Sequence, residues 1–381
     1  MSCQSELFNV VLIIPTGIGA EIGGHAGDAG PVAQLLGEVS DTLVLHPNVV
    51  NASDINEMPP NALYVEGSVL ARLLMGTIGL ERVRSNRVLV IVDDHHDEIF
   101  VNSAINAVSG ARSSYGLSCP EVICVDPPIN MSTTYSPSGR ASGEVENLEF
   151  ICDILDSRQG SYDAVAVSSV IDVPDAYHQG YFDAAGAMVN PWGGVEAMLT
   201  HTLSSIYSVP TAHSPMFESR KIANMDSGIV DPRMASEAIS ATFLQCTLKG
   251  LLRSPQIVTH NDAMKRPGVF SVEDISCLVI PDGCIGLPTL AALEQGIPVI
   301  AVEENENVMR NDLSSLPWNV GQFHRALNYW EAAGLIAAMR AGIDPASTRR
   351  PLAATQVSRI RSETTVSYSE SGLEKMAHVA R

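Results

Sequence analysis

A glycine-rich run from Pro15 to Gly30 is the stretch of this sequence best suited to hold a ligand, because it follows an apolar strand and precedes a helix. Glycine loses the most backbone freedom on folding, so this density is expected where the main chain takes positive φ or approaches a ligand closely. Asp28 fits the cap and Pro31 the first turn of a helix over 31–39, whose free N–H groups would favour an anion. The residues of this run predicted to bind the ligand are Thr16, Gly17, Gly19, Gly23, Gly24 and Asp28.

Polar residues also follow four other predicted strands. Ligands of open parallel sheets bind at the carboxyl ends of the strands, so these residues are the next candidates. The ligand-binding candidates among them are His46, Asn48, Gly286, Glu303 and Asn305.

Cys284 is the strongest nucleophile candidate, because it lies just before a predicted helix whose N-terminus would lower the pKa of the thiol. It suits a nucleophile or a proton-abstracting thiolate, although a cysteine in this setting also serves as a small core residue. His25, Asp94 and Asp282 are the other predicted catalytic residues. Glu196 lies in the first turn of a predicted helix, where the helix dipole favours a carboxylate, so a stabilising role is favoured over the alternative of a general base.

The run 93–98 contains histidine and aspartate side chains that can bind a divalent transition metal. Strand alternation would place Asp94 and His96 on one side, which makes them the metal candidates. The alternative is that this run caps the helix beginning near Ile99. The spacing Gly17-x-Gly19-x-x-x-Gly23 is related to the dinucleotide fingerprint, but the next strand ends without the acidic residue that holds the ribose. The sequence therefore disfavours NAD, requires no cofactor and leaves a divalent metal open.

Strand-like and helix-like runs alternate along almost the whole chain, which predicts parallel sheets covered by helices. The expected fold class is α/β, with two Rossmann-like lobes, mostly parallel sheets and a cleft between them. The predicted boundaries are an N-terminal lobe over 1–128, a linker or mobile loop over 129–143, a C-terminal lobe over 144–345 and a tail over 346–381.

Composition limits the partners and the location. The 381-residue chain has a formal net charge of −20, which would repel nucleic acids and anionic membranes. Its start shows no secretory signal, and no apolar run is long enough to cross a membrane. Seven cysteines without any CxxC pair indicate reduced thiols in a cytoplasm. The sequence leaves a homo-oligomer open.

With Ile14–Ala20 and Asp282–Gly286 as signatures, the chain resembles, over nearly its full length, a conserved uncharacterised family of bacteria, cyanobacteria and plastid-bearing organisms. This resemblance implies a soluble housekeeping or biosynthetic enzyme and transfers no catalytic residue.

Two local likenesses are also present. The segment Asp282–Val302, with its Gly-Ile-Pro-Val-Ile end, resembles the nucleotide-sugar motif of two-lobed glycosyltransferases and sugar-nucleotide epimerases. That likeness would place Gly286 at a diphosphate and Glu303 or Asn305 near the donor. Gly283 followed by Cys284 after a strand is similar to cysteine-dependent racemases, but the first half of the chain lacks a second thiol at a comparable turn.

These observations lead to one expected function and two alternatives. We expect an enzyme that binds a small anionic metabolite at the glycine-rich loop, in a cleft between the lobes, and performs acid/base chemistry of isomerase or lyase type. The first alternative is a sugar-nucleotide-dependent transferase or epimerase. The second is a non-catalytic metabolite-binding or assembly protein.

Overall fold

The structure is a computed structural model that describes residues 7–184, 186–240 and 242–359. Residues 1–6, predicted to carry no secretory signal, and most of the predicted tail, 360–381, lie outside the described residues. The chain forms two compact units, Met1–Gly342 and Ile343–Arg381. Both large sheets belong to the first unit, and the second unit contains the 3-10 turn η4 (Pro345–Thr348).

The first sheet has six parallel strands in the order β17-β16-β15-β1-β2-β5. Its central strands consist mostly of apolar residues that are buried on both faces, as expected for a parallel sheet. The strands are β1 (Asn9–Leu12), β2 (Thr42–Leu45), β5 (Ala62–Tyr64), β15 (Ile275–Pro281), β16 (Val299–Val302) and β17 (Phe323–Ala326).

The second sheet has the order β10-β9-β11-β7-β8, with β12 also paired to β11. Its pairs are parallel except for the antiparallel β9–β10 hairpin. The strands are β7 (Val88–Asp93), β8 (Val122–Val125), β9 (Met131–Tyr135), β10 (Ala141–Val145), β11 (Ala164–Asp172) and β12 (Thr211–Met216).

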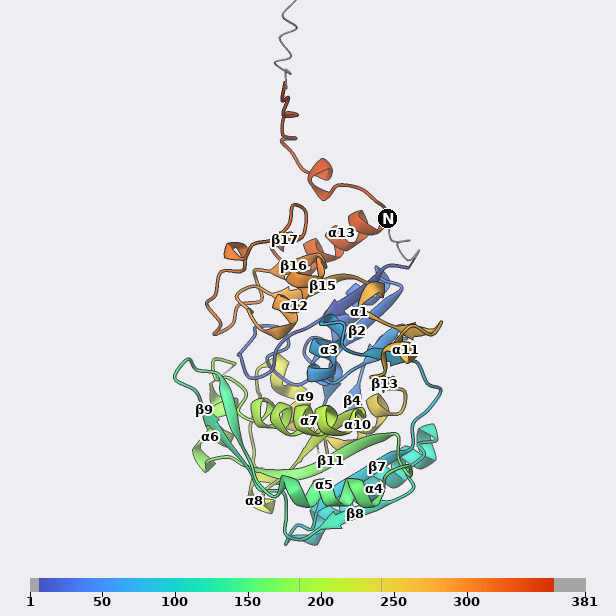
Figure 1. Ribbon diagram of the computed structural model, residues 1–381. Coiled ribbons are helices and arrows are strands. Elements are labelled where there is room, and N and C mark those ends of the chain that lie inside the picture. Colours follow the sequence, from blue (N-terminus) through green and yellow to red (C-terminus); the bar gives the residue numbers. More distant parts are fainter. Residues whose placement is uncertain (1–6, 185, 241, 360–381) are drawn as a thin grey trace, which may run out of the picture. The chain divides into compact units, whose positions relative to one another are not determined.

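Helices cover the two sheets, and α7 (Gly193–Tyr207) lies between them, in contact with β10, β12 and α3 (Gly67–Leu74) (Figure 1). The other longer helices are α1 (Gly30–Glu38), α4 (Glu98–Tyr115), α5 (Leu148–Ser157), α6 (Asp175–Asp183), α10 (Leu244–Leu251), α12 (Leu287–Gln295) and α13 (Tyr329–Arg340).

Short elements complete the described chain. The short helices are α2 (Pro47–Val50), α8 (Arg220–Ala223), α9 (Ala235–Ile239), α11 (Asn261–Met264), η1 (Pro232–Met234), η2 (Val272–Asp274) and η3 (Leu313–Ser315). The short strands are β3 (Asn51–Ala52), β4 (Ile55–Asn56), β6 (Gly79–Glu81), β13 (Gln256–Val258) and β14 (Val269–Phe270). Within the described residues, no helix combines the length and the apolar character needed to cross a membrane.

The predicted α/β class with mostly parallel sheets is confirmed. The sheets divide the chain at other places than the predicted lobe boundaries, because β1 pairs with β15 and joins both ends of the first unit in one sheet. The segment 129–143 contains β9 and the start of β10 instead of a linker without regular structure. Its threonines, Thr133 and Thr134, favour strands, and burial alternates along β9 as in a half-buried hairpin.

Candidate functional site

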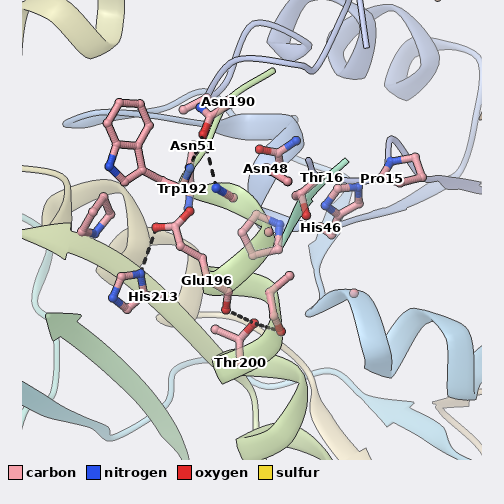
Figure 2. Close-up of a pocket in the computed structure, with 18 of the residues that line it drawn as sticks. Pro15, Thr16, His46, Asn48, Asn51, Asn190, Trp192, Glu196, Thr200 and His213 are labelled. Atoms are coloured by element: carbon pink, nitrogen blue, oxygen red, sulfur yellow. Dashed lines mark hydrogen bonds and ion pairs between the residues drawn. The ribbon is translucent and has the colours of Figure 1, made fainter. Parts of the chain in front are cut away.

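A cavity of about 790 Å³ lies between the two sheets. Ile13 and Ile280 line it from the strands of the first sheet and the residues that follow them, whereas Ile171 and Ala212 line it from the second sheet. Its volume falls in the range of pockets that enclose a whole organic ligand. Figure 2 shows polar side chains from several elements around this cavity. It is therefore the candidate functional site.

Glu196, on the first turn of α7, presents a carboxylate to the cavity that is held from behind by His213 on β12. The Nδ1 atom of His213 lies 2.9 Å from Oε1 of Glu196, and its Nε2 atom lies 2.9 Å from Oγ of Ser169 on β11 (Figure 2 shows the Glu196–His213 pair). The carboxylate only accepts, so Nδ1–H donates to Glu196 and the Ser169 hydroxyl donates to Nε2. The three residues form one hydrogen-bonded chain that ends at the cavity.

The direction of this chain follows from burial. The side chains of Ser169 and His213 are fully buried, whereas the side chain of Glu196 is 26% exposed. Ser169 does not line the cavity, so its hydroxyl fixes the imidazole and cannot meet a ligand as a nucleophile. Glu196 is the member of the chain that can exchange a proton with a bound molecule.

A second carboxylate–imidazole pair, Glu66 with His201, also borders the cavity. Oε1 of Glu66 lies 3.0 Å from Nε2 of His201, and Oε2 accepts from the backbone N–H groups of Ser68 and Val69 at the start of α3. Burial would raise the pKa of Glu66, but the hydrogen bond and charge of His201, together with the Ser68 donors, lower it. Glu66 is an ionised helix cap whose two oxygens are both occupied.

His46, which follows β2, is a buried hydrogen-bond donor that faces the cavity. The backbone N–H of Ile14 donates to its Nε2 atom over 3.1 Å, so the neutral ring carries its proton on Nδ1. Burial lowers the pKa of His46 to about 4, which outweighs the raising effect of the nearby Glu66 charge. His46 is 6% exposed, lines the cavity, and has no acceptor for Nδ1 among the described residues. A ligand oxygen could take this donor.

Close backbone packing brings Thr16 and Arg140 to the start of α7. The N–H of Ala141 donates to the carbonyl of Gly17 over 2.9 Å, and a Cβ atom on Gly17 would lie 3.0 Å from the Ala141 carbonyl oxygen. A Cβ atom on Gly194 would collide with the same carbonyl group. Glycine at these positions lets the loop, the β9–β10 hairpin and α7 meet.

We name this meeting point the anion corner and define it by Thr16, His46, Arg140, Gly193 and Gly194, which all line the cavity. Arg140 makes no ion pair with any described residue. Asn190 accepts from the N–H of Gly193 over 3.2 Å, whereas the next two N–H groups of α7, those of Gly194 and Val195, have no acceptor among the described residues and retain the partial positive charge of a helix start. The free cation, the helix start and the His46 donor all favour an anionic group.

A network around Glu237 of α9 also borders the cavity, and Asn190 joins it to Gly193 of the anion corner. The Glu237 carboxylate accepts from the N–H of Ala26 and from the hydroxyl of Tyr181, both over 2.7 Å, and Tyr181 contacts Nδ1 of His25 over 2.6 Å. Burial raises the pKa of Glu237 to about 7 and lowers the pKa of His25 to about 4. The network ties α9 to the glycine-rich loop.

Hydrogen bonds within the protein occupy much of the glycine-rich loop. The N–H of Gly23 donates to Asp28, and the N–H of Ile22 donates to Asn305. Asp28 therefore does not cap α1, which contradicts that expectation, and burial raises its pKa to about 7. Thr16 lines the cavity. The predicted loop residues that do not line it are Gly17, Gly19, Gly23, Gly24, His25 and Asp28.

Cys284 lines the cavity, but its expected activation is wrong. Burial raises the pKa of the thiol to about 12, with a smaller contribution from Asp282 in the same direction, so the thiol stays protonated. Arg140 acts on Cys284 in the opposite direction, which places this guanidinium near the start of α12. Gly286, the N-cap of α12, also lines the cavity.

The other predicted residues of the second half lie elsewhere. Asp282 and Glu303 pair with Arg325, at 3.6 Å and 3.7 Å, outside the cavity lining. Asn305 is buried and holds the glycine-rich loop through both the N–H and the carbonyl of Ile22. From the first half, His46 and Asn48 do line the cavity, and Asn48 donates to the carbonyl of Gly23.

Asp94 and His96 are exposed and do not line the cavity. No group of three or more His, Cys, Asp or Glu side chains suited to a metal ion occurs in the described part of the chain. The neighbouring Asp93 is buried and accepts from the N–H groups of Ile129 and Val170, so it joins β7 to the adjacent strand.

Sequence reasoning misses the chain of Ser169, His213 and Glu196 as a unit and favours only a stabilising role for Glu196. Ser169 lies within an apolar strand and resembles a core residue in the sequence. Arg140 was assigned to a linker. The sequence does hint at His213 and Glu196, because each is a polar residue among apolar residues that are buried.

The fold and the cavity define an α/β protein with two mostly parallel sheets and a ligand-sized cavity between them. Residues 9–349 match the model of the family described as "Protein of unknown function (DUF3326)", and the chain belongs to that family. It is also 31% identical over 341 residues to an "Uncharacterized lipoprotein" of Synechococcus sp., which covers 88% of this chain and 92% of the relative. No solved structure matches. The family match confirms the predicted uncharacterised family and brings no support for the glycosyltransferase likeness.

Proposed function

We propose that this protein is an enzyme that binds an anionic metabolite in the cavity between its two sheets and transfers a proton on it, in a reaction of isomerase or lyase type. The observation that carries the proposal is the Glu196 carboxylate, which borders the cavity and is oriented from behind by the buried His213 and Ser169. A carboxylate held in one orientation at a ligand cavity is suited to general acid/base catalysis.

The other cavity residues complement this role. The anion corner would hold a carboxylate or phosphate through Arg140 and the N–H groups of Gly194 and Val195 in the first turn of α7. His46 would donate a hydrogen bond from Nδ1–H to a substrate oxygen. Negative charge develops on this oxygen when Glu196 removes a proton from a neighbouring atom. A neutral imidazole of lowered pKa can serve in this way because it donates a hydrogen bond without losing a charge.

Cys284 has a smaller part in this proposal than the sequence predicts. Its raised pKa leaves it as a neutral thiol beside the anion corner, where it contributes to the cavity surface. His25 is similarly occupied by Tyr181 and lies outside the cavity lining. Glu196 is therefore proposed as the general acid/base in place of both residues.

The test is solvent deuterium exchange. The protein would be incubated in D₂O with a mixture of anionic metabolites, and mass spectrometry would show which of them gain deuterium or change mass. We expect at least one metabolite to exchange with the wild type. With Glu196→Gln the rate of this exchange should fall by about 10²- to 10⁴-fold, the usual contribution of a general acid/base.

Glu149→Gln is the matched control, because Glu149 is also a first-turn glutamate, on α5, but is exposed and does not line the cavity. It should exchange like the wild type. If the wild type exchanges no metabolite, or if Glu196→Gln exchanges as fast as the wild type, the proposal is wrong.

We further propose that the protein acts in the cytoplasm. The six cysteines among the described residues are all free thiols, which suits a reducing compartment. The relative from Synechococcus is named a lipoprotein, so a membrane-anchored location is the competing proposal. Fractionation of cells producing the native full-length protein decides between them: recovery in the soluble fraction supports the first, and recovery with membranes that survives a salt wash supports the second.

A further inference from the structure

One side of the cavity is apolar and incompletely covered by protein. We name it the apolar wall and define it by Met216, Phe217, Ile222, Met225 and Phe243, which all line the cavity and are all partly exposed. The rings of Phe217 and Phe243 pack 5.8 Å apart. Apolar surface left facing a cavity costs free energy that an apolar ligand group would recover.

The apolar wall and the anion corner border the same cavity but come from different parts of the chain. The wall extends from the last residue of β12 to the N-cap of α10, whereas the corner combines the glycine-rich loop, the residue after β2, the β9–β10 hairpin and the start of α7. One molecule can therefore contact both surfaces. Two of the wall residues are methionines, whose flexible side chains adapt to apolar groups of varied shape.

The cavity volume argues against a ligand that fills only the anion corner. About 790 Å³ lies in the upper part of the range for pockets that enclose drug-sized ligands. A three- or four-carbon acid at Arg140 and His46 would leave the apolar wall in contact with water. The sequence-based expectation of a small anionic metabolite is thus incomplete.

We propose that the substrate is an amphipathic anion, in which a carboxylate or phosphate in the anion corner is joined to an apolar body that covers the apolar wall. The anionic end of this inference rests on the proposed function, and the apolar end rests on the wall alone. Glu196 would then act on the substrate near the junction of its charged and apolar parts.

The experiment measures the binding of simple probes to the full chain by calorimetry. Straight-chain carboxylates from hexanoate to decanoate test the wall, decanol tests the charge, and octyl phosphate against octanoate distinguishes the two head groups. Each added methylene should tighten binding about fourfold, the factor that corresponds to about 0.8 kcal/mol per buried CH₂. Decanol should bind about tenfold more weakly than decanoate.

Three variants assign the effects to the two surfaces. Ile222→Ser and Met225→Ser should each reduce the gain per methylene, and both positions lie in a short helix or loop where folding is least at risk. Arg140→Gln should weaken decanoate but not decanol. Ile206→Ser, at an exposed apolar position of α7 outside the cavity lining, is the control and should bind every probe like the wild type.

The outcomes separate this inference from the proposed function. Equal affinity for short and long carboxylates overturns the amphipathic substrate and leaves the anion corner and its chemistry standing. Equal binding of decanol and decanoate, unaffected by Arg140→Gln, removes the anion corner and with it both proposals. Chain-length dependence that survives in both wall variants also overturns the inference, because the probes then bind elsewhere.

Discussion

Two carboxylate–imidazole pairs border the same cavity with opposite orders of burial. In the Glu66–His201 pair the carboxylate is 3% exposed and the imidazole 46%, whereas in the Glu196–His213 pair the imidazole is fully buried and the carboxylate faces the cavity. The distances are nearly equal, 3.0 Å and 2.9 Å. Pairing distance alone therefore does not tell which group can react.

The two pairs differ in their other hydrogen-bond partners. The oxygens of Glu66 are shared among a helix start and His201, so this carboxylate stabilises α3. The buried imidazole of His213 has Ser169 on its far nitrogen, so its remaining function is to orient Glu196. Both ring nitrogens of His213 are occupied, so Glu196 is the member of its pair that can exchange a proton with a ligand.

The largest expected effect compares Glu196→Gln with Glu66→Gln in the deuterium-exchange assay. The first change should lower exchange by about 10²- to 10⁴-fold because it removes the base, and the second should lower it by less than about threefold. Glutamine keeps the shape of both residues, so folding is little disturbed. Equal losses from the two changes would break the comparison.

His46 offers a pH test, because its ring is held by a backbone N–H instead of a carboxylate. Its pKa is lowered from 6.5 to about 4, so between these values the unfolded chain binds more protons than the folded chain. The stability that His46 contributes is present above pH 6.5 and is lost as the pH falls to about 4. It amounts to about 3 kcal/mol over this range, since each pKa unit corresponds to about 1.4 kcal/mol.

Urea unfolding at pH 7.5, 6 and 5 measures this effect. His46→Asn keeps an acceptor for Ile14 and should show a smaller loss of unfolding free energy on acidification than the wild type. Asp28 and Glu237 have raised pKa values and act in the opposite direction, but they are common to both proteins and cancel in the comparison. His96→Asn, at an exposed position, should follow the wild type. Parallel curves for His46→Asn and the wild type would contradict the assignment.

In a stability test the order of the two effects is reversed: substitution of Glu66 should cost more than substitution of Glu196. Glu66→Ala should lower the free energy of unfolding by about 2 kcal/mol, because the first N–H groups of α3 lose their acceptor in a buried setting. Glu196→Ala should lower it by only about 1 kcal/mol, since it leaves one buried donor, Nδ1–H of His213, without an acceptor, whereas Glu66→Ala removes the acceptor of two backbone N–H groups and of His201. Chemical denaturation of both variants measures the difference, and a larger loss for Glu196→Ala would show that Glu196 is mainly structural.

The smallest expected effect concerns Ser169 as a positioning residue. Ser169→Ala removes the hydroxyl that fixes His213, and kcat should fall about tenfold with KM unchanged once a substrate is found. Loss of one hydrogen bond should lower the free energy of unfolding by about 1 kcal/mol. A lower stability with unchanged kcat would restrict Ser169 to a structural role.

Local patterns in the sequence were sufficient to predict most strands of the two large sheets, but not β9, β10 and β17, and most of the longer helices, but not α6. Apolar runs such as Val88–Val92 are buried on both faces, as their composition predicts. Polar residues after strands also identified Thr16, His46, Asn48 and Gly286 as cavity residues. The segment 232–252, whose apolar composition predicts one long helix, instead forms η1, α9 and α10, and Ser240 takes an extended conformation between α9 and α10.

The remaining features depend on contacts between distant segments. Glu196, His213 and Ser169 come from three elements, and only the pairing of β11 with β12 and the packing of α7 on β12 bring them together. The glycine-rich loop was predicted as an open anion site, but Asn305, some 280 residues further along the chain, occupies one of its N–H groups. No local pattern encodes such a partner.

The pairing of β1 with β15 affects the order in which the sheets can form during synthesis on the ribosome. Asn9 and Ser276, which join the two strands by a hydrogen bond, are 267 residues apart. At about 5–20 residues per second, a ribosome needs roughly 15–50 seconds to deliver the second strand after the first. During that interval the newborn β1 has an unprotected hydrogen-bonding edge, while the strands of the second sheet emerge complete. The first sheet, which contains the first strand of the chain, is therefore the last of the two large sheets to be completed.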